Sequence, residues 1–111
     1  MTARVFIPQL VERFDQGTGR LVPVFDFSAA ASFGQLTPIL EPSDNIQFLA
    51  HLAPKIRKAL QDFGPDDYFV AVGDPTVIAI CAGIIFRRNQ RANILKWDRK
   101  LSIYNNIEVN P

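Results

Sequence analysis

The sequence predicts an α/β protein with two layers, in which a mixed β-sheet of four to six strands packs against two main helices. Three observations predict this class. Short apolar runs bounded by turn residues alternate with longer segments of helical period. One of these runs leads directly into a capped apolar helix and then into another strand. In addition, 48% of the 111 residues are hydrophobic, which is enough for one core. We therefore expect a single domain over residues 1–111.

The beginning of the chain is typical of a β-hairpin. Residues 5–14 resemble a strand, and residues 21–27 resemble its returning partner. Between them, residues 15–19 contain two glycines, which supply the positive φ angles of a tight reversal. Pro8 and Pro23 each lack the N–H group that a strand ladder requires, so we expect both at a sheet edge or a bulge.

The middle of the chain alternates between short and long elements. Residues 28–33 predict a short helical turn, and residues 35–40 predict a short strand. A longer helix is expected over about residues 44–63, because apolar residues recur there at intervals of three and four. Ser43 is its expected cap. Pro54 falls inside this helix and removes a backbone hydrogen bond, so we expect a kink or a division into two helices there.

The next segment predicts a βαβ unit with a right-handed crossover. Residues 68–72 form a short apolar run that is typical of a buried central strand. Asp74 suits a helix cap, and Pro75 suits the first helical position. The helix that follows is apolar almost all round, so we expect it to be buried on more than one side. It leads into a strand over residues 93–97.

The chain ends in a second predicted hairpin. Residues 98–100 form its turn, and residues 101–104 form the strand that pairs with residues 93–97. Asn105 and Asn106 are expected to interrupt the strand before residues 107–109.

The turn from the central strand into the apolar helix is the first candidate site. Gly73, Asp74 and Thr76 lie where a helix N-terminus presents free N–H groups, an arrangement that binds phosphate. A phosphorylated small molecule is therefore one hypothesis. The alternative is that the Asp74 carboxylate satisfies these groups itself and repels an anion, which is the commoner role. Neither a G-x-G-x-x-G motif nor a Walker lysine supports phosphate binding here.

A cluster of basic residues beside an aromatic ring is the second candidate site, and it suits nucleic acid. Charged side chains contact phosphates, and flat rings stack on bases. The alternative is a solvated helix end and a solvated hairpin tip, which the formal net charge of +1 favours. The candidate residues are Arg87, Arg88, Arg91, Lys96, Trp97, Arg99 and Lys100.

The sequence contains no recognisable catalytic pattern, and we expect no catalytic residue, no metal and no cofactor. His51 is the single histidine, and we expect it just off the apolar stripe of its helix, at or near the surface. Cys81 lies within the apolar helix, where a cysteine usually acts as a small buried filler. Asp66 and Asp67 precede the central strand, where we expect a solvated turn rather than a cation site.

The composition indicates a soluble cytoplasmic protein. A single cysteine excludes an intrachain disulfide. The first residues lack the apolar region of a signal peptide. The longest apolar run, residues 77–86, is about half as long as the roughly 20 residues that a membrane span needs.

Two stretches resemble a known group of proteins. Residues 67–75 contain Asp-Tyr, four further residues and then Gly-Asp-Pro, and residues 95–98 read Leu-Lys-Trp-Asp. Both stretches resemble motifs of small accessory proteins encoded by tailed bacteriophages. These motifs carry no known activity. The resemblance implies a viral accessory protein that acts in the cytoplasm of the host bacterium.

The favoured functional hypothesis is a non-enzymatic binding protein that acts on a host or viral protein, with a homodimer as one arrangement. It rests on the missing catalytic pattern beside a well-formed core. Nucleic-acid binding through the basic residues is the first alternative. Binding of a phosphorylated ligand at Gly73, Asp74 and Thr76 is the second.

Overall fold

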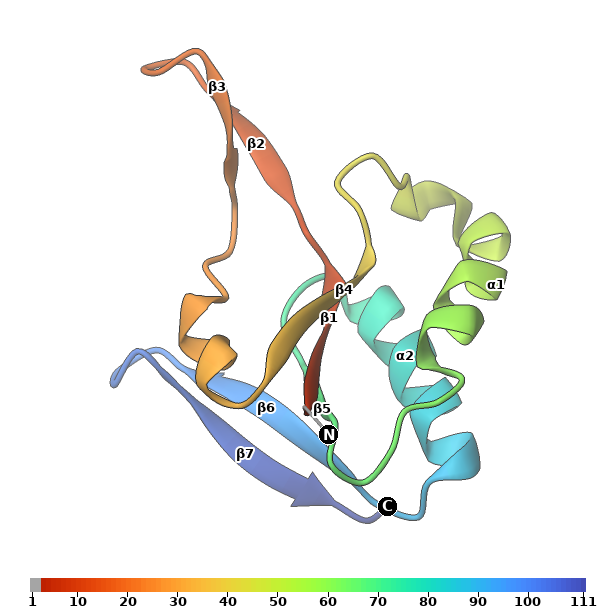
Figure 1. Ribbon diagram of the computed structural model, residues 1–111. Coiled ribbons are helices and arrows are strands. Elements are labelled where there is room, and N and C mark those ends of the chain that lie inside the picture. The colour runs from red at the N-terminus through yellow and green to blue at the C-terminus, as the bar shows by residue number, and fades with distance from the viewer. Residues whose placement is uncertain (1–2) are drawn as a thin grey trace.

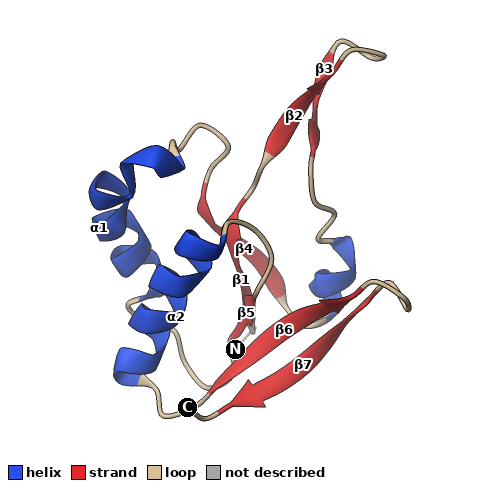
Figure 2. Cartoon of the chain, turned by 180° about the vertical axis from the view of Figure 1, so that it is seen from behind, coloured by secondary structure: helices blue, strands red, loops and turns tan. Residues whose placement is uncertain are grey.

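The computed structural model describes residues 3–111, and its elements are shown in Figures 1 and 2. In chain order they are β1 (Arg4–Gln9), β2 (Glu12–Asp15), β3 (Arg20–Pro23), the 3-10 helix η1 (Ser28–Ser32), β4 (Gln35–Leu40), the 3-10 helix η2 (Ile46–Phe48), α1 (Leu49–Leu60), β5 (Tyr68–Val70), α2 (Pro75–Arg88), β6 (Ala92–Asp98) and β7 (Ile103–Val109).

Five strands form the main sheet, in the order β4-β1-β5-β6-β7. The first four are parallel and β7 runs antiparallel to β6. After β1 the chain adds β4 on one side of it. It then crosses back and adds β5 and β6 in turn on the other side of β1. Right-handed connections then require η1 to cross one face and the two α-helices to cross the other. The predicted two-layer mixed sheet is confirmed, and so are the central position of β5 and the βαβ unit β5-α2-β6.

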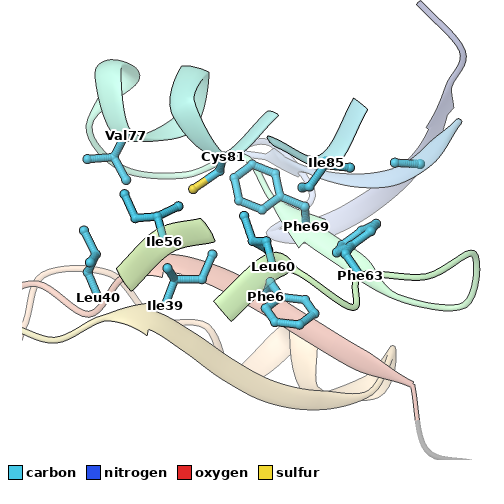
Figure 3. Packing of buried hydrophobic residues seen from close by; sticks show 11 residues of the cluster. Phe6, Ile39, Leu40, Ile56, Leu60, Phe63, Phe69, Val77, Cys81 and Ile85 are labelled. Atoms are coloured by element: carbon cyan, nitrogen blue, oxygen red, sulfur yellow. The ribbon is translucent and has the colours of Figure 1, made fainter. Parts of the chain in front are cut away.

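Both faces of the sheet are covered, and alternation along the strands divides the core between them. Phe6 points to the helices, whereas its neighbours Val5 and Ile7 point to the η1 face. Figure 3 shows side chains of α1 and α2 packed against those of the strands. This helix-side core consists of Phe6, Ile39, Leu40, Ile56, Leu60, Phe63, Phe69, Val77, Cys81, Ile85 and Ala92. The smaller core on the opposite face consists of Val5, Ile7, Phe27, Ala30, Val70, Leu95 and Tyr104.

The predicted N-terminal hairpin exists, but it is shorter and lies outside the main sheet. Strands β2 and β3 pair with each other from Glu12↔Pro23 to Asp15↔Arg20. They form a two-stranded arm that projects from the body (Figures 1 and 2). Residues 5–9, which were expected to belong to this hairpin, form β1 in the main sheet instead. Residues 25–27 are not a strand.

The prediction that Pro8 lies at an edge is wrong. β1 is an inner strand between β4 and β5 and Pro8 is fully buried, but β1 is registered with β5 only through Val5 and Phe6. Pro8 therefore lies beyond the end of that ladder, where its missing N–H group breaks no pairing. Pro38 lies in the edge strand β4, which is where strands usually accommodate a proline, because one side of an edge strand has no partner that needs its N–H group.

The first long helix begins later than expected. Its predicted cap, Ser43, is wrong: Asn45 caps the short helix η2 by accepting a hydrogen bond from the Gln47 backbone N–H at 3.0 Å. The helix α1 then runs without interruption through Pro54. The division therefore falls between η2 and α1, before the proline rather than at it.

The last third of the chain differs from expectation in one strand. The helix α2 is covered on more than one side, as expected: Val77, Cys81 and Ile85 are buried, and four further apolar residues are half-buried against the same core, while Gly83 is exposed. β7 continues through Asn105 and Asn106 because both pair with β6. A strand at a sheet edge tolerates these polar side chains, which remain exposed.

Candidate functional site

The carboxyl ends of the parallel strands carry two neighbouring hollows. Ligands of open α/β sheets usually bind at this edge, where loops that follow several strands converge. Val24 and Phe25, at the base of the arm, contribute to both hollows. We call them the switch-point groove and the aromatic pocket.

The switch-point groove has a volume of about 560 Å³. It lies at the ends of β1, β4 and β5, where the direction of strand addition reverses, and this is the position at which such folds bind ligands. Its lining residues are Gln9, Val11, Glu12, Val24, Phe25, Pro42, Ser43, Asp44, Asn45, Ile46, Gly73 and Asp74.

One wall of this groove is fixed by two polar side chains. The Gln9 amide donates to the carbonyls of Glu41 at 3.0 Å and Asp44 at 2.9 Å, which ties the loop after β4 to the end of β1. The Asp44 carboxylate accepts from the Glu41 N–H at 2.8 Å and from Lys55 Nζ at 2.5 Å. The hydrogen bond from Lys55 lowers the pKa of Asp44, so this carboxylate is ionised but already paired.

Gly73 and Asp74 of the first candidate site line the groove and Thr76 does not, and the structure gives Asp74 a capping role. Asp74 Oδ1 accepts from the backbone N–H of Thr76 at 2.9 Å and of Val77 at 3.1 Å. Pro75 has no N–H group. Among the described residues, the free donors at the start of α2 are therefore already occupied, and a carboxylate stands where an anion would bind.

Gly73 has a φ angle of +131°, which residues with a side chain rarely adopt. A methyl group on its Cα would meet no heavy atom within 4 Å, so the barrier to substitution is backbone strain and not a clash. We expect Gly73→Ala to lower the free energy of unfolding by about 1–3 kcal/mol. Urea denaturation followed by circular dichroism measures this change. Gly83→Ala is the matched control, because Gly83 lies in a helix and is exposed; it should be neutral or stabilising. Equal effects of the two substitutions would contradict the strain at Gly73.

The aromatic pocket has a volume of about 510 Å³ and lies at the ends of β5 and β6. Trp97 of β6 and Tyr104 of β7 face each other across the ladder, with ring centroids 4.8 Å apart. Phe25 and the exposed Asp26 approach from the segment after the arm. The lining residues are Val24, Phe25, Asp26, Ser28, Ala29, Val72, Trp97, Ser102 and Tyr104.

The structure does not bring the second candidate site together. Arg87, Arg88 and Arg91 lie at one end of β6, and Arg99 and Lys100 lie at the other. β6 separates Arg91 from Arg99 by roughly 25 Å, at about 3.3 Å per residue. Part of the set is already engaged: Arg88 donates to the Gln61 carbonyl at 2.9 Å, and Arg91 pairs with Glu108 at 3.1 Å.

The aromatic member of that set also points away from its basic neighbour. Lys96 and Trp97 are consecutive in β6, so their side chains lie on opposite faces of the sheet. Trp97 packs in the η1-side core and lines the aromatic pocket, whereas Lys96 is exposed. The basic residues therefore form separate patches and lack a shared stacking surface.

Asp67 is a buried carboxylate that accepts several hydrogen bonds, and the sequence pattern did not reveal it. A solvated turn was expected at this position. Its side chain is only 9% exposed and forms an ion pair with Arg4 Nη2 at 2.8 Å. It also accepts from the backbone N–H groups of Arg4 at 3.1 Å and Gly64 at 2.9 Å. One signal was present in the sequence: Arg4 and Asp67 each directly precede an apolar run, and the two runs are neighbouring parallel strands.

Cys81 and His51 lie where they were expected. Cys81 is buried, and burial raises the pKa of its thiol to about 12, so it is an inert filler. His51 is exposed on α1 and lies edge-on to Phe48. Within residues 3–111, no three His, Cys, Asp or Glu side chains are grouped so as to hold a metal ion.

The arm carries two large exposed apolar side chains. Phe14 and Leu21 are 60% and 63% exposed, and they are direct cross-strand partners. Glu12 and Pro23 share their face of the arm, because side chains alternate along each strand. No sequence pattern identified this surface, since the same residues suited a hairpin packed into the sheet.

Together, a mostly parallel five-stranded sheet, two hollows at its carboxyl edge and a projecting two-stranded arm define a small α/β protein. A family model described as Phage Pam3 gp32-like protein matches residues 3–111, and the chain belongs to this family. The predicted resemblance to phage proteins is thereby confirmed.

Neither the comparison with curated proteins nor the comparison with solved structures gives a significant match. Among the described residues, every helix is too short or too polar to cross a membrane.

Proposed function

We propose that this phage protein is a non-enzymatic accessory factor that binds another viral or host protein through the arm. The observation that carries this proposal is the exposed pair of Phe14 and Leu21. Large apolar side chains that stand together on a projecting element favour insertion into a complementary surface. A partner with an apolar pocket would bury both side chains at once.

The arm is shaped before binding, which lowers the entropic cost of association. Asp15 fixes the tip by accepting hydrogen bonds from the Gly17 N–H at 3.2 Å and the Thr18 hydroxyl at 3.0 Å. The Gly19 N–H donates to the Asp15 carbonyl at 2.8 Å, and Gly19 has a φ of +69°. Both outer edges of this two-stranded sheet are also unpaired within the described chain, so a partner strand could extend it.

An isolated two-stranded hairpin is only marginally stable in water. Packing of Phe14 and Leu21 against a partner would add the apolar contact that β2 and β3 lack in the free protein. A partner would therefore stabilise the conformation that the arm already has.

A crosslinking experiment tests the proposal. A photoreactive phenylalanine at position 14 should give a specific adduct with one protein during infection, and the same residue at position 101 should not. Leu101 is 66% exposed at the β6–β7 turn and is the matched control position. The identified partner is then purified, and its affinity for the wild type and for variants is measured by calorimetry.

We expect Phe14→Ser and Leu21→Ser each to weaken this complex by about 30-fold, which corresponds to roughly 2 kcal/mol for a central apolar contact. Leu101→Ser should leave the affinity unchanged. Crosslinking that is equal at positions 14 and 101, or affinity that both arm substitutions leave intact, would refute binding through the arm.

A further inference from the structure

We propose that the aromatic pocket is a second binding site, separate from the arm, and that it takes a guanidinium group. The pocket joins three aromatic rings and one carboxylate from different parts of the chain. Phe25 and Asp26 come from the segment after the arm, Trp97 from β6 and Tyr104 from β7.

The rings supply the first part of the chemistry. The face of an aromatic ring attracts a cation, with indole the strongest, and a planar guanidinium also stacks on it. Trp97 and Phe25 are half-buried, so each ring still presents part of its surface to the pocket. Tyr104 is 7% exposed and lies beside Trp97 on the neighbouring strand, at a centroid distance of 4.8 Å.

Asp26 supplies the second part. Its Oδ1 accepts from the Ser28 N–H at 2.9 Å, and the Ser28 side chain also acts on the carboxylate as a donor, so Ser28 holds Asp26 at the pocket wall. Hydrogen bonds from the Ser28 backbone and side chain lower the pKa of Asp26, so the group is ionised at neutral pH. Of the ion pairs formed among residues 3–111, none involves Asp26.

The charge of Asp26 also acts on the pocket itself. Burial raises the pKa of the Tyr104 hydroxyl, and the negative charge of Asp26 raises it further. Asp26 lines the same pocket as Tyr104 and Trp97, so the pocket contains a negative charge beside aromatic surface.

The polar rim selects guanidinium over a quaternary ammonium ion. Ser28 and Ser102 line the pocket with Asp26 and bring hydroxyl oxygens that accept hydrogen bonds. A guanidinium has five N–H donors in one plane and can use these acceptors, whereas a quaternary ammonium has none.

The single tryptophan makes the test direct, because Trp97 is the only indole in the chain. Trp97 fluorescence is followed while N-acetyl-argininamide is added to the full-length protein. We expect a saturable change with a dissociation constant of roughly 1 mM, which corresponds to about 4 kcal/mol. N-acetyl-citrullinamide has nearly the same shape without the charge, and tetramethylammonium has the charge without donors. Both should bind at least about fivefold more weakly.

Substitutions connect the signal to the pocket. Asp26→Asn should weaken binding of N-acetyl-argininamide by roughly tenfold, and Phe25→Leu should weaken it while keeping the site apolar. Asp66→Asn, at an exposed carboxylate that does not line the pocket, is the matched control. Circular dichroism verifies that each variant is folded. No saturable change, equal binding of the citrulline derivative, or an Asp26→Asn variant that binds like the wild type would each overturn the proposal.

The same titration identifies where the guanidinium comes from. A glycine-arginine-glycine peptide that binds more tightly than N-acetyl-argininamide indicates an arginine of another protein, and equal affinity indicates a free guanidino compound. The arm substitutions Phe14→Ser and Leu21→Ser should leave both titrations unchanged, so failure of this site and failure of the arm are distinguishable.

Discussion

Replacement of Asp67 by alanine should lower the free energy of unfolding by about 3 kcal/mol. The Asp67 carboxylate is the acceptor for the Arg4 guanidinium and for two backbone N–H groups, those of Arg4 and Gly64. Its removal leaves those N–H groups without an acceptor and Arg4 without its buried partner, and loss of one member of a buried pair costs about 3–5 kcal/mol. We take the lower end because the Arg4 side chain is 30% exposed and solvent compensates part of the loss.

Urea denaturation measures this effect, and Asp66→Ala is the matched control. Asp66 is the preceding residue in the chain and is exposed, so its substitution should change stability by less than about 0.5 kcal/mol. A similar small change for Asp67→Ala would contradict the structural role of the Arg4–Asp67 pair.

The same pair predicts how stability depends on pH. Burial alone would raise the pKa of Asp67, but hydrogen bonds from Arg4 and Gly64 outweigh it and hold the pKa below its ordinary value. A carboxylate with a lowered pKa stabilises the folded state above its unfolded pKa of about 3.9, and this contribution is lost as the pH falls through the folded value. We expect wild-type stability to decline below about pH 4, and the decline to be shallower in Asp67→Ala. Parallel pH curves would contradict this assignment.

The Phe69→Ala substitution should have the largest effect on stability, about 3–5 kcal/mol. Phe69 is 1% exposed in the central strand β5 and contributes to the helix-side core. Truncation of a buried phenylalanine removes its transfer free energy and leaves a cavity that the two helices and the sheet cannot fully close. Typical domains unfold with a total of about 5–15 kcal/mol, so this variant should be close to unfolding.

Phe48→Ala is the matched control for Phe69→Ala, because Phe48 is 58% exposed on η2. We expect a change within about 0.5 kcal/mol there. Thermal unfolding monitored by circular dichroism compares both variants with the wild type. If Phe69→Ala unfolded within a few degrees of the wild type, the central position of β5 in the core would be wrong.

The two proposed binding surfaces lie on the same edge of the molecule but use different chemistry. The arm presents apolar side chains, and the aromatic pocket presents rings with a carboxylate. Both are connected through residues 24–26, which run from the end of β3 into the pocket wall. A partner with an apolar pocket for Phe14 and Leu21 and an arginine nearby would satisfy both proposals at once.

The sequence by itself determined the local elements. Local patterns predicted the strand at residues 68–72, the cap at Asp74 and the helix that follows. Strand period, capping and helix period all depend on neighbours within a few residues. The class of sheet followed from their order. The capping role that the sequence favoured for Asp74 is the one seen in the structure, because an N-cap is a local interaction.

Tertiary structure decided the partners of those elements. β1 pairs with β4 and β5 rather than with the strand that follows it, and Arg4 meets a residue 63 positions away. Local patterns cannot specify such pairings, because parallel strands are joined by long crossovers. For the same reason the exposure of Phe14 and Leu21, the burial of Asp67 and the separation of the basic residues became visible only in the folded chain.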